Sequence, residues 1–306
     1  MSDVQTIYAE ALETLIAKVR ADSYIVAAVL VGSLAYDTVW ERSDIDLLLV
    51  TEETRQSKEG VCLVEMGVNV HCSLLTRSQF RKLLEGSAQG SFMHSMLGKG
   101  QMLFSRDEPL VELFEARHVM GDRDRAAQLL RVTARFLPAL TKAEKWFHAK
   151  QDYDYCFLWL MKCVDSLASI ELLLHGEAPS REVIQRALVL NPELFRGLYT
   201  DLIHTDPSIP ALEAALKSVT AYLHAHLHAL FGLVLDYLRD EGEVRSITEI
   251  NHVFERSFNI EGVDTACEWL ADEGIIQKLA VPVRLTAKSR VDMEEAAYYF
   301  GGEQDQ

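Results

Sequence analysis

The stretch LVGSLAYDTVWERSDIDLLLV, residues 30–50, places a polar loop between two apolar segments. The first segment, residues 25–31, is rich in β-branched side chains and predicts a buried strand. Gly32 then permits a tight turn and a close approach of the backbone to a ligand, and Ser33 adds a hydroxyl group. The second segment, residues 45–50, predicts another strand, so two strands meet at a polar loop.

Two carboxylates stand where the second strand begins. Because side chains alternate along a strand, Asp44 and Asp46 are expected on the same face, side by side. Like charges this close raise each other's pKa unless a cation neutralises them, and Mg²⁺ prefers carboxylate oxygens together with phosphate oxygens. The pattern G-S-x10-D-x-D therefore predicts a site for a nucleoside triphosphate (NTP). In the alternative, Gly32 and Ser33 only form a turn and a helix cap, but Asp46 then stays unpaired within an apolar strand, which is costly.

These residues resemble the signature of the DNA polymerase β-type nucleotidyltransferase superfamily, in particular the small bacterial branch that contains the aminoglycoside nucleotidyltransferases. The resemblance covers the first third of the chain and implies a mixed sheet with flanking helices. It also implies that Gly32 and Ser33 hold the nucleotide phosphates, and that Asp44 and Asp46 bind Mg²⁺ or Mn²⁺. The implied enzyme transfers a nucleoside monophosphate from an NTP to a hydroxyl acceptor, a small molecule or a macromolecule, and releases pyrophosphate.

The sequence departs from this family at the third carboxylate, which follows a V-x-V pattern on the strand after a tight turn. Residues 61–66 and 68–75 predict two strands that meet at such a turn, and His71 stands in the carboxylate position. Imidazole binds Mg²⁺ weakly and Mn²⁺ or Zn²⁺ better. Histidine in place of a carboxylate therefore changes which metal the site is expected to prefer and which group can act as the general base. Two interpretations are open: His71 is a working base or ligand, or the site is partly degenerate. Glu65 replaces the missing carboxylate only if the sheet register brings it across.

The degenerate interpretation leads to a second class of function. A nucleotide-binding sensor would use the same turn and carboxylates without turnover, and would signal through rearrangement of its other domains. Metal-dependent turnover distinguishes such a regulatory module from an enzyme.

The composition restricts partners and location. The chain of 306 residues has 46 acidic and 30 basic side chains, and its net charge of −16 repels polyanions, so duplex DNA is not an expected partner. The five cysteines form no CxxC pair and no metal-ligand spacing, which is typical of reduced thiols in a cytoplasmic protein. The N-terminus is acidic and amphipathic, and no apolar run is long enough to span a membrane. We therefore expect a cytoplasmic protein without membrane contact, for which a homodimer is a candidate assembly.

The fold class expected is α+β, with three domains. Residues 1–118 form the nucleotidyltransferase-type domain, with its mixed sheet and flanking helices. Residues 119–242 form an all-α helical bundle, because strand patterns end near Asp122, and residues 243–306 form a small winged-helix-like domain. The ranges predicted as helices of the bundle are 124–150, 152–175, 180–189, 192–204 and 209–239.

Lysines are candidates for phosphate binding outside the Gly-Ser turn. The bundle resembles the helical domain that follows the catalytic domain in small nucleotidyltransferases, where a lysine binds nucleotide phosphates and a carboxylate serves as base. Lys145 corresponds to that lysine, and Glu144 is the nearest carboxylate, although it is out of register. For both, the alternative is a solvated charge on an amphipathic helix. Lys99, between two glycines, is a further candidate, but no phosphate-loop pattern surrounds it.

The histidines of HAHLH do not predict a zinc site. Only His224 and His228 share a face of the predicted helix, and the remaining ligands are missing. Surface or packed histidines are the better interpretation.

The C-terminal segment resembles a winged helix-turn-helix. Ser246 caps a helix, a second helix follows at 262–272, residues 274–288 alternate like a two-stranded wing, and residues 291–299 predict a closing helix. DNA binding requires basic side chains on the second helix. That segment carries only acidic charges, at Glu261, Asp264, Glu268, Asp272 and Glu273. The pattern favours protein contact, or a lid over the active-site cleft, over DNA binding.

Overall fold

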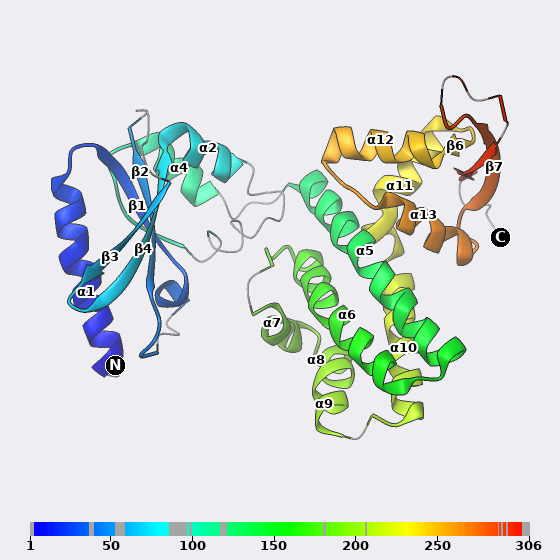
Figure 1. Ribbon diagram of the computed structural model, residues 1–306, viewed down its shortest axis with the longest axis horizontal. Coiled ribbons are helices and arrows are strands. Elements are labelled where there is room, and N and C mark those ends of the chain that lie inside the picture. Colours follow the sequence, from blue (N-terminus) through cyan, green and yellow to red (C-terminus); the bar gives the residue numbers. More distant parts are fainter. Residues whose placement is uncertain are drawn as a thin grey trace. The chain divides into compact units, whose positions relative to one another are not determined.

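A computed structural model describes residues 3–36, 40–52, 59–85, 97, 100–116, 121–179, 182–205, 207–286, 288, 290–291 and 293–301. Lys99 lies outside the described residues. The chain divides into two compact units, Met1–Met120 and Gly121–Gln306 (Figure 1). The predicted boundary at residue 118 lies close to this division, and the one at residue 242 lies inside the second unit. The three-domain division stays a prediction.

The first unit is built on a five-stranded mixed sheet with the strand order β3-β4-β2-β1-β5. Its strands are β1 (Ile25–Val31), β2 (Ile45–Thr51), β3 (Gly60–Glu65), β4 (Val68–Thr76) and β5 (Gln101–Ser105). Neighbouring strands are antiparallel except β2 and β4, which are parallel. The strands predicted from the apolar runs are confirmed, and so is the edge position of residues 101–105.

Helices cover both faces of this sheet. Helix α1 (Asp3–Ala21) packs Tyr8 and Leu15 into one core, together with strand residues such as Leu47. Helices α2 (Arg77–Glu85) and α4 (Glu108–Ala116) form the core of the opposite face, which includes Phe80, Phe114 and Leu48. All seven residues of β1 are buried, since this strand has helices on both sides. That is why its sequence is continuously apolar instead of alternating.

The second unit begins with a helical hairpin. Helix α5 (Asp122–Glu144) continues through a π-helical turn, Lys145–Lys150, and packs against α6 (Tyr153–Leu174). Asp152 begins α6, because its carboxylate accepts a hydrogen bond from the Tyr155 amide at 3.1 Å. The elements that follow are α7 (Val183–Leu190), α8 (Pro192–Phe195), a π-helical turn at Arg196–Asp201, α9 (Leu202–His204), α10 (Ile209–Ala225) and α11 (Leu227–Glu241).

The single helix predicted for residues 209–239 is wrong. His226 leaves the helical region at φ −113° and ψ 19°, so α10 and α11 are separate helices bent by 54°. His224 and His228 therefore lie on different helices, and His224 Nε2 instead lies 2.8 Å from Glu273 Oε2. No single helix in the described part of the chain is long and apolar enough to span a membrane; α10 and α11 pass that test only as a bent pair.

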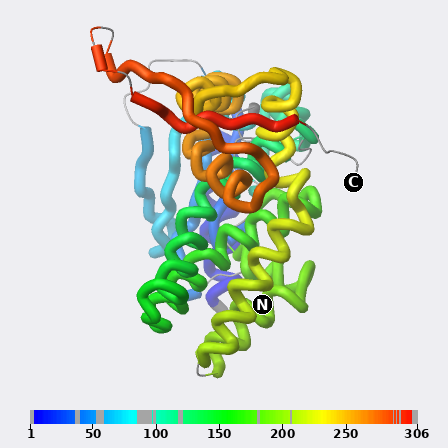
Figure 2. Tube along the Cα trace, turned by 90° about the vertical axis from the view of Figure 1, so that its right-hand side faces the viewer, coloured from blue at the N-terminus to red at the C-terminus, as the bar shows by residue number. Residues whose placement is uncertain are grey.

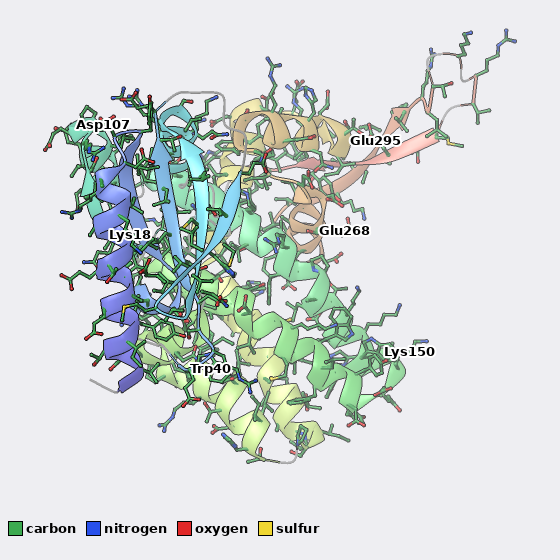
Figure 3. All side chains as sticks on the ribbon, turned by 60° about the vertical axis from the view of Figure 1, so that its left-hand side comes forward. Lys18, Trp40, Asp107, Lys150, Glu268 and Glu295 are labelled. Atoms are coloured by element: carbon green, nitrogen blue, oxygen red, sulfur yellow. The ribbon has the colours of Figure 1, made fainter. Side chains whose placement is uncertain are left out.

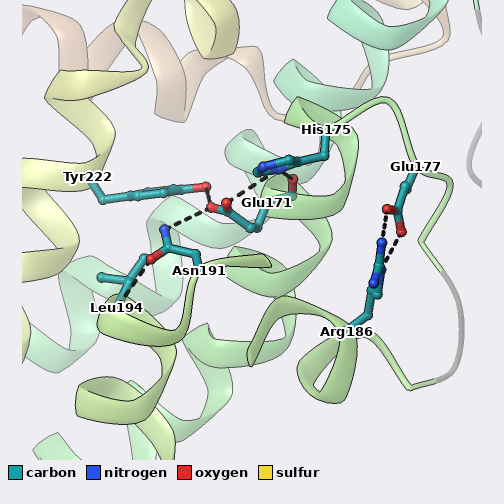
Figure 4. A network of polar contacts seen from close by, with 7 residues as sticks. All are labelled: Glu171, His175, Glu177, Arg186, Asn191, Leu194 and Tyr222. Atoms are coloured by element: carbon teal, nitrogen blue, oxygen red, sulfur yellow. Dashed lines mark hydrogen bonds and ion pairs between the residues drawn. The ribbon is translucent and has the colours of Figure 1, made fainter. Parts of the chain in front are cut away.

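A buried carboxylate joins three segments of the second unit. The Glu171 side chain is 5% exposed and accepts hydrogen bonds from the Tyr222 hydroxyl at 2.6 Å and the Asn191 amide at 3.3 Å (Figure 4). His175 Nδ1 lies 3.4 Å from its Oε1 atom. Burial raises the pKa of Tyr222, and the hydrogen bond to Glu171 raises it further. The phenol is therefore a permanent donor to this carboxylate.

Removal of that donor is expected to destabilise the protein. Tyr222→Phe should lower the free energy of unfolding by about 1–3 kcal/mol, because a buried charged acceptor loses a partner. Chemical denaturation measures the change. Tyr155→Phe is the matched control, since Tyr155 is 49% exposed, and we expect a change within about 0.5 kcal/mol for this variant. Equal effects of the two substitutions would contradict a stabilising role for the Glu171 network.

The chain ends in a small antiparallel sheet of order β6-β8-β7, next to two helices (Figure 2). Its elements are β6 (Arg245–Ser246), α12 (Ile247–Phe258), α13 (Val263–Asp272), β7 (Gln277–Val283) and β8 (Met293–Tyr299). The predicted cap is confirmed: Ser246 Oγ accepts from the Glu249 amide, and the Glu249 carboxylate accepts from the Ser246 amide. The winged-helix resemblance stays a prediction.

The closing helix predicted for residues 291–299 is wrong, because this segment contains strand β8. Its sequence, MEEAAYY, contains good helix formers. However, β8 pairs with β7 on one side and β6 on the other, and these pairings bury Ala297 and Tyr298. Packing against neighbouring strands overrides the local preference. The second strand of the predicted wing is therefore β8, beyond residues 274–288.

All five cysteines are free, as the sequence predicts, and four of them are buried: Cys72, Cys156, Cys163 and Cys267. Burial raises the pKa of the Cys72 thiol to about 11. These buried thiols are therefore protonated and unreactive.

Candidate functional site

The predicted turn lies at the end of β1. Gly32 has φ +76°, a conformation that side chains with a Cβ rarely adopt, and Ser33 begins a short 3₁₀ turn, Ser33–Tyr36. The Ala35 amide donates to the Gly32 carbonyl at 3.1 Å. A Cβ atom added at Gly32 would lie 2.1 Å from Oδ2 of Asp46. Glycine is therefore needed both for the backbone conformation and for the approach to this carboxylate.

The two predicted aspartates lie where the polar loop enters β2. Ile45, between them, is fully buried, whereas Asp44 and Asp46 are partly exposed, in keeping with the alternation along a strand. The loop lies at the end of the sheet that carries Trp40, opposite the end that carries Asp107 (Figure 3). Both carboxylates are thus directed away from the core, at the same end of the sheet as the Gly32 turn.

The sheet register brings His71 to this site. Asp46 pairs with Val31 of β1 on one side and with His71 of β4 on the other. His71 Nδ1 lies 3.9 Å from Asp46 Oδ1, and the imidazole is 53% exposed. The ring therefore does not point into the core.

Glu65 does not replace the third carboxylate. It pairs with Val68 at the turn between β3 and β4, whereas Cys62 is the β3 residue that pairs with His71. The Glu65 carboxylate instead lies 2.6 Å from the Lys18 ammonium on α1. This interaction fixes Glu65 to the helix, away from Asp46.

The loop before Asp44 is held by a side chain of helix α1. The Tyr8 hydroxyl, on α1, donates to the Ser43 carbonyl at 2.5 Å. Burial raises the pKa of Tyr8, and the charge of Asp44 raises it further. Tyr8 packs against the sheet, and its hydroxyl fixes the entry to β2.

A cavity of about 490 Å³ adjoins Asp44. It lies between the first turns of α1, the loop that enters β2, and the turn between β3 and β4. The residues that line it are Val4, Ile7, Tyr8, Glu41, Arg42, Ser43, Asp44, Met66, Gly67, Val68 and Asn69. No sequence motif indicates this cavity, because its three walls are far apart along the chain.

The residues present fit a hard divalent cation. Asp44 and Asp46 supply carboxylate oxygens, and protein sites for Mg²⁺ commonly use one or two carboxylates together with substrate phosphates. The absence of a side chain at Gly32 leaves the predicted phosphate-binding turn against one of these carboxylates. Within the described ranges, no three His, Cys, Asp or Glu side chains are close enough to bind one metal ion. The described residues thus offer two carboxylates and an adjacent turn.

The two candidates from the bundle lie in the second unit. Lys145 is exposed and begins the π-helical turn, a type of helical irregularity that is frequent at functional sites. Glu144 is half-buried: burial raises its pKa, nearby His148 lowers it, and Glu273 raises it. The structure brings Gly32, Asp46 and His71 together in the first unit, and the phosphate-binding role of Lys145 stays a prediction.

Comparisons with known proteins agree with this geometry. Residues 13–109, which include all five strands of the first sheet, match the family model described as polymerase beta, nucleotidyltransferase. The comparison with curated proteins gave no match. A solved structure, a nucleotidyltransferase-like protein from Exiguobacterium sibiricum 255-15, is similar with a TM-score of 0.62 and 16% sequence identity. The alignment covers 95% of this chain and 98% of that one, so the likeness in fold extends through both units.

Proposed function

Since residues 13–109 form a polymerase β-type nucleotidyltransferase domain, we propose that the chain transfers a nucleoside monophosphate from an NTP to a hydroxyl acceptor and releases pyrophosphate. One observation carries this proposal. The sheet register sets Asp46 between the Gly32 turn and His71, so a glycine turn, a carboxylate and an imidazole meet at one end of the sheet.

Each group at this end of the sheet has a role in the proposal. Ser33 and the turn amides hold the nucleotide phosphates, and Asp44 and Asp46 hold Mg²⁺ or Mn²⁺. Such a cation, when bound, supplies positive charge that offsets the charge on the reacting phosphate. The protein's own contribution is then positioning: the rigid end of β1 fixes the phosphates relative to the first residues of β2.

His71 is the proposed general base. Histidine is the side chain that most often acts as a general base, because a ring nitrogen can accept a proton from a hydroxyl group. Nδ1 is the nitrogen near Asp46 Oδ1, at 3.9 Å, which leaves Nε2 for the acceptor hydroxyl. The exposed ring is accessible to such a hydroxyl.

A specific observation also supports the second candidate function, a catalytically degenerate nucleotide sensor. The third carboxylate of the family is His71 here, and the described residues provide no three-ligand metal set. In this function the nucleotide binds at the same turn, and its occupancy changes the arrangement of the helical segments.

The decisive experiment incubates the full-length protein with labelled NTPs, Mg²⁺ or Mn²⁺, and a panel of acceptors that includes aminoglycosides, tRNA and proteins. Metal-dependent pyrophosphate release together with a labelled acceptor supports the enzyme. Binding of NTP without release under any metal supports the sensor. Absence of NTP binding contradicts both functions.

Substitution of His71 tests the departure from the family pattern. His71→Asp should shift the preference toward Mg²⁺ over Mn²⁺ by about tenfold, because it places a further carboxylate beside Asp46 and Mg²⁺ prefers oxygen ligands. Pyrophosphate release at a series of Mg²⁺ and Mn²⁺ concentrations measures the shift. Because His71 is exposed, the melting temperature should change little.

Ser73→Asp is the matched control, since Ser73 is exposed on the same face of β4 and is farther from Asp46. It should leave the metal preference unchanged. A lower melting temperature of His71→Asp without any change in metal preference would show that His71 is not at the metal site.

A further inference from the structure

A cluster of aromatic rings and lysines covers part of the helical hairpin that begins the second unit. The Trp146 ring, in the π-helical turn after α5, stacks on Tyr155 of α6 with 4.6 Å between the ring centroids and an interplanar angle of 30°. The Lys142 ammonium lies 4.4 Å from the centroid of the Trp159 ring, and the Lys162 ammonium lies 3.9 Å from it. The cluster therefore joins three rings and two cations from both sides of the hairpin.

Helical spacing keeps this cluster at the surface. Tyr155, Trp159 and Lys162 follow each other at intervals of four and three residues, so they share one face of α6. The Tyr155 side chain is 49% exposed, although Trp146 covers one face of its ring. The exposed area therefore belongs to the other face and the edge of the ring, where a further flat group can stack.

The cations of this cluster have no carboxylate partners. In the part of the chain that the structure describes, no carboxylate lies within ion-pair distance of the Lys142 or Lys162 ammonium groups. Arg135 is exposed two turns before Lys142 on the same face of α5. The exposed acids of α6, Asp154 and Asp165, are about a quarter turn around that helix from the face that carries Lys162. The cluster is thus locally cationic in an acidic protein.

We propose that this surface binds single-stranded nucleic acid, with a base stacked on Tyr155 and phosphates next to Lys142, Lys162 and Arg135. Base–aromatic stacking is available to every base, and lysine and arginine neutralise phosphates. Both parts of a nucleotide therefore have a partner on this surface.

The exposed ring selects a single strand over a duplex, because neighbouring base pairs cover the base faces in a duplex. The net charge of −16 repels either form at long range. However, salt screens charges beyond about 8 Å at physiological ionic strength. The cations next to the bound strand therefore dominate at contact.

The spacing of the cations favours a strand over a free nucleotide. Arg135 and Lys142 are seven residues apart, which is about 10 Å along the helix axis. A single phosphate group cannot contact both side chains, whereas successive phosphates of a strand can. Contacts at an exposed surface are individually weak, so a strand that repeats them binds more tightly than a mononucleotide.

The experiment measures the fluorescence anisotropy of labelled oligo(A), as RNA and as DNA, titrated with the full-length protein. A length of about 12 nucleotides lies in the range of known single-strand sites. We expect the affinity to fall about twentyfold between about 50 and 200 mM salt, because three neutralised phosphates of a single strand give a logarithmic slope of about −2.

Substitutions separate the ring from the cations. Tyr155→Ala should weaken binding by about tenfold, because one stacked base loses its platform. Tyr155→Phe keeps the ring and should bind like the wild type. Lys142→Gln combined with Lys162→Gln should weaken binding and make the salt slope shallower by about 1.4. Circular dichroism checks that each variant is folded, and the lysine variant tests the surface even if Tyr155→Ala does not fold.

Matched controls remove the same groups elsewhere. Tyr24→Ala removes a ring that is 67% exposed in the first unit. Lys217→Gln combined with Lys278→Gln removes two cations of the second unit that are paired with Glu213 and Glu268. Both controls should bind like the wild type, and losses equal to those of the test variants would contradict binding at this surface.

Binding of RNA, DNA or both supports the proposal. Absence of binding to both strands at low salt would overturn it. Equal binding of the matching duplex would also overturn it, because a duplex offers phosphates without exposed base faces. Equal binding of polyglutamate would assign the surface to an acidic protein segment instead, and competition by AMP as strong as that of the strand would assign it to a free nucleotide.

Discussion

Asp46→Asn is expected to reduce metal-dependent pyrophosphate release by about a hundredfold to a thousandfold, because the charge that holds the cation next to the phosphates is lost. Asp44→Asn should have an effect of the same kind. The fold should remain intact in both variants. Asparagine has nearly the same shape as aspartate, both positions are partly exposed, and removal of a negative charge relieves the repulsion between neighbouring carboxylates.

Glu65→Gln is the matched control for these variants, because it removes a carboxylate that lies near Lys18 on α1 instead of at the site. The Lys18 ammonium is 63% exposed and glutamine keeps an oxygen that can accept its hydrogen bond, although the Glu65 side chain itself is only 11% exposed. We therefore expect the free energy of unfolding to change by about 1 kcal/mol. Turnover should be that of the wild type. Nucleotide affinity and turnover, measured in the same variants, test whether Asp44 and Asp46 form the metal site. Wild-type affinity and wild-type turnover in both Asp44→Asn and Asp46→Asn would contradict that role.

Gly32→Ala should affect both stability and the site. A non-glycine residue with a positive φ costs about 1–2 kcal/mol. In addition, the new Cβ would lie 2.1 Å from Asp46 Oδ2, so the carboxylate must move away from the turn. We therefore expect a lower melting temperature together with a loss of nucleotide affinity close to that of Asp46→Asn.

Gly67→Ala, studied by thermal unfolding, separates the cost of a positive φ from the cost of the contact between the new Cβ and Asp46. Gly67 has φ +81°, and a Cβ added there meets no atom within 4 Å, so this variant shows the backbone cost alone. Gly32→Ala should be the less stable of the two by the cost of the contact with Asp46. Equal melting temperatures, combined with unchanged nucleotide affinity in Gly32→Ala, would mean that the close approach of the turn to Asp46 has no role.

The sequence by itself determined the elements whose signals are local. The apolar run at residues 25–31 has the bounds of strand β1, and Gly32 turns the chain where that run ends. The strand that carries His71 also follows from its own sequence, whereas the pairing of His71 with Asp46 is set by the sheet register. The strands and the turn depend on a residue's own chain neighbours, so a single stretch contains the information.

The tertiary structure alone decided the features that depend on distant segments. Residues 293–299 form a strand because β6 and β7 lie on either side of them, despite a composition that favours a helix. The loop before Asp44 is fixed by Tyr8, which is 35 residues away from its partner Ser43. The cavity beside Asp44 combines α1, the β2 entry loop and the β3–β4 turn. Each of these features arises where segments far apart in sequence come into contact. The pattern of apolar residues along one segment does not show which other segment it will contact.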